Sequence, residues 1–246
     1  MVSGHEALGR LREGNRRFVA SMADTAPALS QTRRLALAGG QQPFAIVLGC
    51  SDSRVPAELV FGQGFGDLFV IRVAGNIVAP SQVGSVEFAA ARFDTRLVVV
   101  LGHTECGAIT ATIEELREPT LHHSPGLRAI VDRIRPAVEP LLATPLRDQA
   151  EALVAHAVRA NIRAAADHLR HGSALLERLA ELGSPASQVA GLNHEHCVRF
   201  VERKRSLEIA SVDRLGEVVD GIALSGHRER SPGGLKHPFR AWVQAA

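Results

Sequence analysis

The chain has 246 residues, of which 46% are hydrophobic, and a formal net charge of only +2. This length suits a single α/β domain with a sizeable buried core. The basic residues are nearly all arginines dispersed among acids, and tyrosine is absent. These features do not favour a nucleic-acid-binding surface.

The N-terminal segment MVSGHEALGRLREGNRRFVAS lacks the continuous apolar stretch of a signal peptide. The longest apolar runs fall well short of the roughly 20 residues that cross a bilayer, so we expect no membrane association. We therefore expect a cytoplasmic protein, where thiols stay reduced. Three cysteines in such a chain favour metal binding or catalysis over disulfides.

Apolar periodicity predicts an amphipathic helix over residues 4–22 and a short helix over 31–40. Residues 44–49, 68–73 and 97–101 are almost continuously apolar, which is typical of parallel strands that are covered on both faces.

Helical spacing continues at residues 81–93 and 107–116. Residues 124–183 are also predicted to be helical, with breaks at the prolines and glycine of that stretch: Pro136, Pro140, Pro145 and Gly172.

The C-terminal part, residues 184–246, has a weaker pattern. Residues 207–224 (LEIASVDRLGEVVDGIAL) favour one or two strands, one of them an edge strand, and a loose tail follows from about residue 225. The alternation of strands and helices predicts an α/β fold: a central, mostly parallel β-sheet flanked by helices, in one domain over residues 1–246.

Reactive side chains follow two of the predicted strands. Cys50 follows the first strand, and His103 and Cys106 follow the third. In parallel sheets, ligands bind beyond the carboxyl ends of the strands. Two thiolates and an imidazole are a ligand set for zinc, and three protein ligands leave the fourth tetrahedral position open for water, as in catalytic sites.

Asp52 and Arg54 alternate with Cys50, so all three side chains are predicted to point the same way. A carboxylate beside a zinc-bound water accepts its hydrogen bond, and a guanidinium holds that carboxylate through two hydrogen bonds. The residues alone also allow a thiol enzyme, with Cys50 or Cys106 as nucleophile and His103 as base.

The segments CSDSRVPAE, GDLFVIRVAGNIV, GSVEFAA and LVVVLGHTECGAI, in this order, resemble the β-class carbonic anhydrases over about residues 1–180. The resemblance implies a zinc lyase with one Zn²⁺ per subunit, bound by Cys50, His103 and Cys106, and with Asp52 and Arg54 as catalytic residues. It implies reversible hydration of carbon dioxide to bicarbonate. The substrate-binding residues that it implies are Gln41, Phe69, Phe88 and Gly107.

The resemblance also implies a homodimer or homotetramer, and we expect the N-terminal helix to cross onto the partner because its apolar stripe needs cover. Two alternatives stay open: hydrolysis of carbon disulfide or carbonyl sulfide on the same scaffold, and a non-catalytic zinc-binding protein.

One branch of the family closes its site when bicarbonate binds a second pocket, and the aspartate then takes the fourth zinc position. Here the pocket arginine is present as Arg72, but Val47 stands in place of the tryptophan and no tyrosine exists. Asp52 would be a zinc ligand only in that closed, inactive state. We therefore predict a resting state in which Asp52 pairs with Arg54.

Overall fold

A computed structural model describes residues 2–20, 31–119, 124–181 and 208–212. Its centre is a parallel four-stranded sheet in the order β2–β1–β3–β4. The strands are β1 (Ala45–Gly49), β2 (Leu68–Arg72), β3 (Leu97–Leu101) and β4 (Glu208–Val212). The α/β prediction is confirmed, and β4 supplies the expected edge strand from the C-terminal region.

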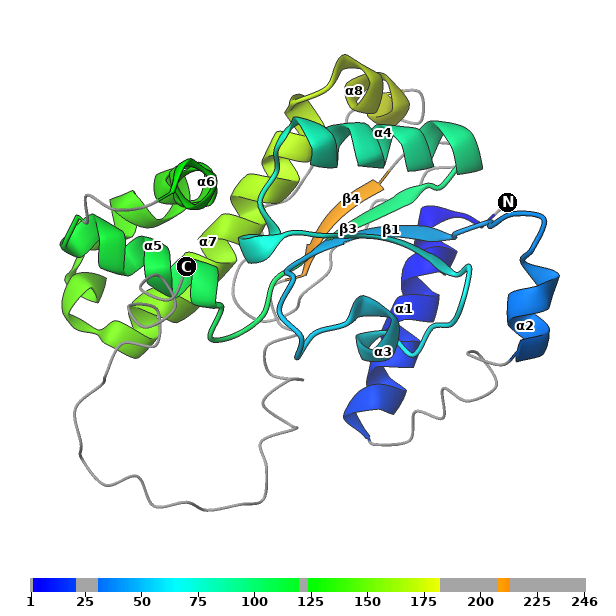
Figure 1. Ribbon diagram of the computed structural model, residues 1–246, viewed down its shortest axis with the longest axis horizontal. Coiled ribbons are helices and arrows are strands. Elements are labelled where there is room, and N and C mark those ends of the chain that lie inside the picture. Colours follow the sequence, from blue (N-terminus) through cyan, green and yellow to red (C-terminus); the bar gives the residue numbers. More distant parts are fainter. Residues whose placement is uncertain (1, 21–30, 120–123, 182–207, 213–246) are drawn as a thin grey trace.

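Helices cover both faces of the sheet (Figure 1). One face carries α1 (Gly4–Val19) and α3 (Ala57–Val60). The other face carries α4 (Pro80–Phe93), α5 (Gly107–Arg117), α6 (Pro125–Leu142), α7 (Ala150–His171) and α8 (Ala174–Glu181). The short helix α2 (Gln31–Ala36) lies at one side, and two 3₁₀ turns, η1 (Ala74–Asn76) and η2 (Pro145–Asp148), lie in connections.

The two faces follow from the alternation of side chains along each strand. Ile46 and Leu48 of β1 pack into the core beneath α4 and α7, whereas Ala45 and Val47 pack into the core beneath α1. All five residues of β1 are buried, because each face has its own helical layer. This double coverage accounts for the continuous apolar sequence of the central strands.

The N-terminal helix is placed within its own chain. The Ser3 side chain caps α1 by accepting a hydrogen bond from the Glu6 N–H, and Leu8 and Leu11 are buried against the sheet. That α1 also contacts a second copy of the chain stays a prediction. The apolar stripe that motivated it already has its cover, since it packs on β1 and β3 of the same chain.

The predicted breaks at Pro136 and Pro140 are wrong, because both prolines lie inside α6. They stand four residues apart and both are exposed, so they share the solvent-facing side of the helix. Carbonyl groups that lose an intrahelical partner on this side can bond to water. The helices do end near Pro145 and Gly172, as predicted.

Among the helices of the described ranges, none is long and apolar enough to cross a membrane. The predicted second C-terminal strand and the tail from about residue 225 lie outside the described residues, as does Cys197.

Candidate metal centre and active site

The two strand ends that carry reactive side chains are neighbours in the sheet. β1 pairs with β3, and Gly49 lies opposite Leu101 at the carboxyl end. Cys50 follows immediately after β1, and His103 follows β3 by two residues. The parallel register therefore brings together residues that are more than fifty positions apart in the sequence.

Cys50, His103 and Cys106 form a compact group of metal donors. One donor atom from each lies within 4.8 Å of the others, and all three residues are at most 5% exposed. The sulfur atoms of Cys50 and Cys106 are 4.0 Å apart. Burial of three such groups around one point is typical of a metal centre and unusual for a packed core.

The orientation of His103 fits a metal. Its Nδ1 lies 2.9 Å from the Thr104 carbonyl oxygen, to which it donates as Nδ1–H, and this leaves Nε2 as the basic nitrogen. Nε2 is buried and has no hydrogen-bond partner in the described part of the chain. A buried acceptor without a partner is costly, and a Zn²⁺ ion held by this nitrogen and the two sulfurs would satisfy it.

The two thiols titrate as a pair. Their mutual hydrogen bond lowers the pKa of Cys50 to about 4 and raises the pKa of Cys106. Burial lowers the pKa of His103, but the adjacent Cys50 and Asp52 outweigh burial and raise it overall. Cys50 is thus predisposed to the thiolate form that binds metals.

Asp52 and Arg54 form a two-pronged ion pair beside the donors. Arg54 donates from Nε to Oδ1 at 2.9 Å and from its terminal nitrogen to Oδ2 at 2.8 Å. The Arg54 backbone N–H also donates to Oδ1. The hydrogen bond from Arg54 is the main reason that the pKa of Asp52 falls to about 2, so the carboxyl stays ionised. Asp52 Oδ2 lies 3.9 Å from His103 Nε2, which places the carboxylate beside the three candidate metal ligands.

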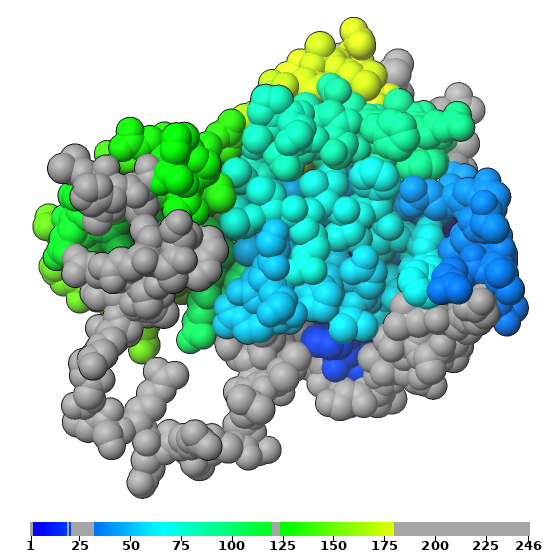
Figure 2. Space-filling view, in the orientation of Figure 1, coloured from blue at the N-terminus to red at the C-terminus, as the bar shows by residue number. Residues whose placement is uncertain are grey.

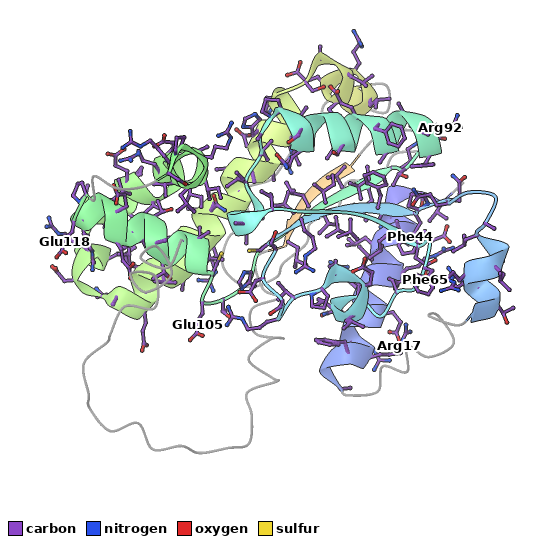
Figure 3. The ribbon with its side chains drawn as sticks, in the orientation of Figure 1. Arg17, Phe44, Phe65, Arg92, Glu105 and Glu118 are labelled. Atoms are coloured by element: carbon purple, nitrogen blue, oxygen red, sulfur yellow. The ribbon has the colours of Figure 1, made fainter. Side chains whose placement is uncertain are left out.

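Arg54 also links the two strand ends. Its guanidinium donates to the Glu105 carbonyl oxygen at 3.0 Å, across 51 positions of sequence. Glu105 has a φ of 51°, a left-handed conformation that is uncommon for a residue with a side chain. Figure 3 shows the Glu105 side chain projecting away from the ribbon at the turn before α5. Arg54 therefore stabilises the strained turn that separates His103 from Cys106.

Arg72 holds the segment after β1 from the other side. It donates to the carbonyl oxygens of Cys50 and Asp52 at 3.0 and 2.5 Å. In this structure the guanidinium is therefore engaged with the backbone of the CxDxR segment. The family resemblance assigns Arg72 to a second bicarbonate pocket. Its contacts with these two carbonyl groups were not predicted, because they depend on the β1–β2 register.

Gly107 lies where α5 begins, directly after Cys106, the residue that caps this helix. It is exposed, and a Cβ built there would meet no atom of the described residues within 4 Å. An open helix N-terminus next to a metal donor presents free backbone N–H groups to an anionic ligand.

Within one chain, three of the predicted substrate residues lie away from the donors. Phe69 is paired with Ile46, four residues before Cys50, which corresponds to about 13 Å along the strand. Phe88 contacts Phe69 with ring centroids 6.2 Å apart and is 54% exposed on α4. Gln41 is exposed and precedes β1, at the opposite end of the sheet from Cys50. In Figure 2, α4 forms part of the outer surface of the molecule.

Helix α7 contributes contacts that sequence reasoning missed. Asn161 is 3% exposed and donates to the Gly75 carbonyl oxygen at 2.8 Å. Ile162, the next residue, packs so closely on Gly102 that a Cβ there would lie 2.4 Å from its Cδ1. The available signal was a polar residue on an otherwise apolar stripe of α7 that includes Ala157, Val158 and Ala165.

Comparison with known proteins agrees with this geometry. A family model described as carbonic anhydrase matches residues 45–196, which is more than half of the chain. Carbonic anhydrase 2 of Mycobacterium tuberculosis is 45% identical over 130 residues, covering 52% of this chain. Carbonic anhydrase of Mycolicibacterium smegmatis is 44% identical over 128 residues, again covering 52% of this chain. The match spans 61% of the length of each of these relatives.

Solved structures share the architecture. The β-carbonic anhydrase CafA of Aspergillus fumigatus has a TM-score of 0.55 at 23% identity, covering 83% of this chain and 84% of its own, which supports the fold. A tetrameric β-carbonic anhydrase of Sordaria macrospora has a TM-score of 0.51 at 26% identity, covering 71% and 86%. The family model, the mycobacterial relatives and the shared architecture together show that the chain belongs to the carbonic anhydrase family, in its β class.

Proposed function

We propose that this protein catalyses the zinc-dependent, reversible conversion of carbon dioxide and water to bicarbonate and a proton. The observation that carries the proposal is Nε2 of buried His103, which has no hydrogen-bond partner among the described residues. This nitrogen is grouped with two cysteine sulfurs and flanked by the Asp52–Arg54 pair. The names of the mycobacterial relatives support the same reaction.

Cys50, His103 and Cys106 would hold the zinc ion. Bound zinc lowers the pKa of water and so supplies a nucleophile near neutral pH. Asp52 would accept a hydrogen bond from that nucleophile and orient it, because Arg54 donates to both carboxylate oxygens and keeps the group ionised. The N–H of exposed Gly107, at the start of α5, would be available to donate to the developing negative charge of bicarbonate.

Gln41, Phe69 and Phe88 enter the proposal as residues supplied by a second copy. Phe69 lies about 13 Å along the sheet from the donors of its own chain, too far to touch a molecule bound at them. The exposed Phe88 ring, which contacts both Phe69 and Phe93, offers an apolar surface for such a partner. The tetrameric state named for the Sordaria macrospora enzyme supports a homo-oligomer, either a dimer or a tetramer.

The resting site is proposed to be open, with Asp52 held away from the metal by Arg54. Three hydrogen bonds join Arg54 to the Asp52 carboxylate, and Arg72 is occupied by backbone carbonyls. Val47, where the closing branch of the family has tryptophan, is fully buried in the core and offers no hydrogen-bond donor. We therefore expect no cooperative loss of rate as bicarbonate is added.

Stopped-flow measurement of carbon dioxide hydration by zinc-quantified protein tests the proposal. We expect turnover in the wild type and only the uncatalysed rate in Cys106→Ser. Carbon disulfide consumption should be measured on the same sample. Turnover of carbon disulfide without carbon dioxide hydration would overturn the proposed reaction while leaving the metal site in place.

A further inference from the structure

Asn161 of α7 stands out among the buried residues near the donors, because it is polar and lies outside every motif that carries the family resemblance. It lies 86 positions after Gly75 in the sequence, and its side-chain nitrogen donates to the Gly75 carbonyl oxygen at 2.8 Å. Both residues are buried, so water cannot replace this hydrogen bond when it is lost.

Gly75 connects helix α7 to the candidate metal ligand Cys50. Its backbone N–H donates to the Cys50 sulfur at 3.3 Å. Its φ is 68°, in the left-handed region that glycine occupies without strain. Glycine can equally adopt other conformations, and therefore something else must hold it in this one.

The surroundings of Gly75 show what holds it. A Cβ at this position would lie 2.7 Å from Ile134 Cδ1 of α6 and 3.0 Å from Ala108 Cβ of α5. These contacts limit the space around the Cα atom but exert no directional force. The Asn161 amide is the directional contact, because it fixes the carbonyl and with it the rotation of the residue.

We propose that Asn161 is a positioning residue for the metal centre: it holds Gly75 so that the Gly75 N–H donates to the Cys50 sulfur. A hydrogen bond to a thiolate draws electron density from sulfur, and outer contacts of this kind commonly change metal affinity about 10- to 100-fold when removed. This inference rests on the proposed metal site, but it does not depend on which reaction that site performs.

The test compares three proteins loaded with Co²⁺: wild type, Asn161→Leu, which cannot donate, and Asn161→Asp, which keeps the shape but presents a carboxylate to the carbonyl. We expect both variants to shift the sulfur-to-cobalt charge-transfer band to longer wavelength. We also expect them to release the metal to a chelator about 10- to 100-fold faster. Leu169→Ala is the matched control, because it opens a cavity beside buried α7 about two helical turns beyond Asn161 and should leave the band in place.

A second measurement needs no variant to fold. In wild-type protein loaded with ¹¹³Cd, the Gly75 amide proton should show scalar coupling to the metal through the Cys50 sulfur. Failure of the wild type to bind Co²⁺ or Cd²⁺ would overturn the metal site itself. Two results would overturn the role of Asn161 alone. One is metal binding without coupling between Gly75 and the metal. The other is an unchanged charge-transfer band and an unchanged rate of metal release in Asn161→Leu.

Discussion

The sulfur atoms of Cys50 and Cys106 lie 4.0 Å apart, although 56 residues separate them in the chain. Two sulfurs bound to one tetrahedral zinc ion at about 2.3 Å each stand about 3.8 Å apart. The fold therefore sets the sulfur spacing that zinc requires, through the parallel pairing of β1 with β3 and the turn that leads into α5.

Removing either sulfur should remove the metal. We expect the wild type to carry about one zinc ion per chain. Cys50→Ser and Cys106→Ser should lose it, because a site with three protein ligands cannot spare one. His103→Ala should behave in the same way. Cys197→Ser is the control and should keep its zinc. Elemental analysis that finds full zinc in both single variants would rule out the ligand assignment.

Asp52→Asn should keep zinc and lose turnover by about 10- to 100-fold, because an amide presents a donor where the site needs an acceptor. Asp67→Asn is the matched control, since Asp67 also pairs with an arginine, Arg33, but lies before β2, away from the donors. Stopped-flow rates at measured zinc content decide the outcome. Near-normal turnover in Asp52→Asn would remove this carboxylate from the mechanism.

The Asp52–Arg54 pair should also affect stability in a pH-dependent way. The pKa of Asp52 is about 2 in the folded chain, below the 3.8 that is usual for an aspartate, so the pair stabilises the fold above the unfolded pKa. This contribution is lost as the pH falls through the folded pKa. We expect the free energy of unfolding of the wild type to exceed that of Asp52→Asn by only about 1 kcal/mol, because the ion pair is partly solvated.

Urea unfolding of both proteins across the pH range measures this difference. It should be constant above about pH 5 and should disappear as the pH falls towards about 2. A difference that already declines between pH 8 and pH 6 would show that another group controls it.

The contact between β3 and α7 predicts a steric defect. Gly102→Ala would place a Cβ against Ile162 and should lower the free energy of unfolding by about 1–3 kcal/mol. In an Ile162→Ala background the same change should cost less, because the opposing atoms are gone. A Cβ in Gly84→Ala on α4 would have no described neighbour within 4 Å, so this change should be neutral or stabilising by up to about 1 kcal/mol. If the two changes lower the free energy of unfolding additively in the double variant, Gly102→Ala does not clash with Ile162.

The local sequence pattern is sufficient to predict a feature that depends on a single helix, strand or turn. The buried strands, the zinc-type donors after them and the CxDxR spacing could all be read from neighbouring residues, because burial and side-chain alternation act over short distances. Local pattern predicts a helix break at Pro136 and at Pro140, but both lie on the solvent-facing side of α6 and do not end it. Asn161 and the Arg72 contacts could not be predicted, since each depends on packing between elements far apart in the chain.

The dependence of carbon dioxide hydration on bound zinc tests the central claim most directly. Samples stripped of metal and reloaded to graded zinc contents should be assayed by stopped flow. The rate should rise in proportion to bound zinc and stop rising at about one ion per chain. Fully loaded protein that hydrates carbon dioxide no faster than buffer alone would contradict the account.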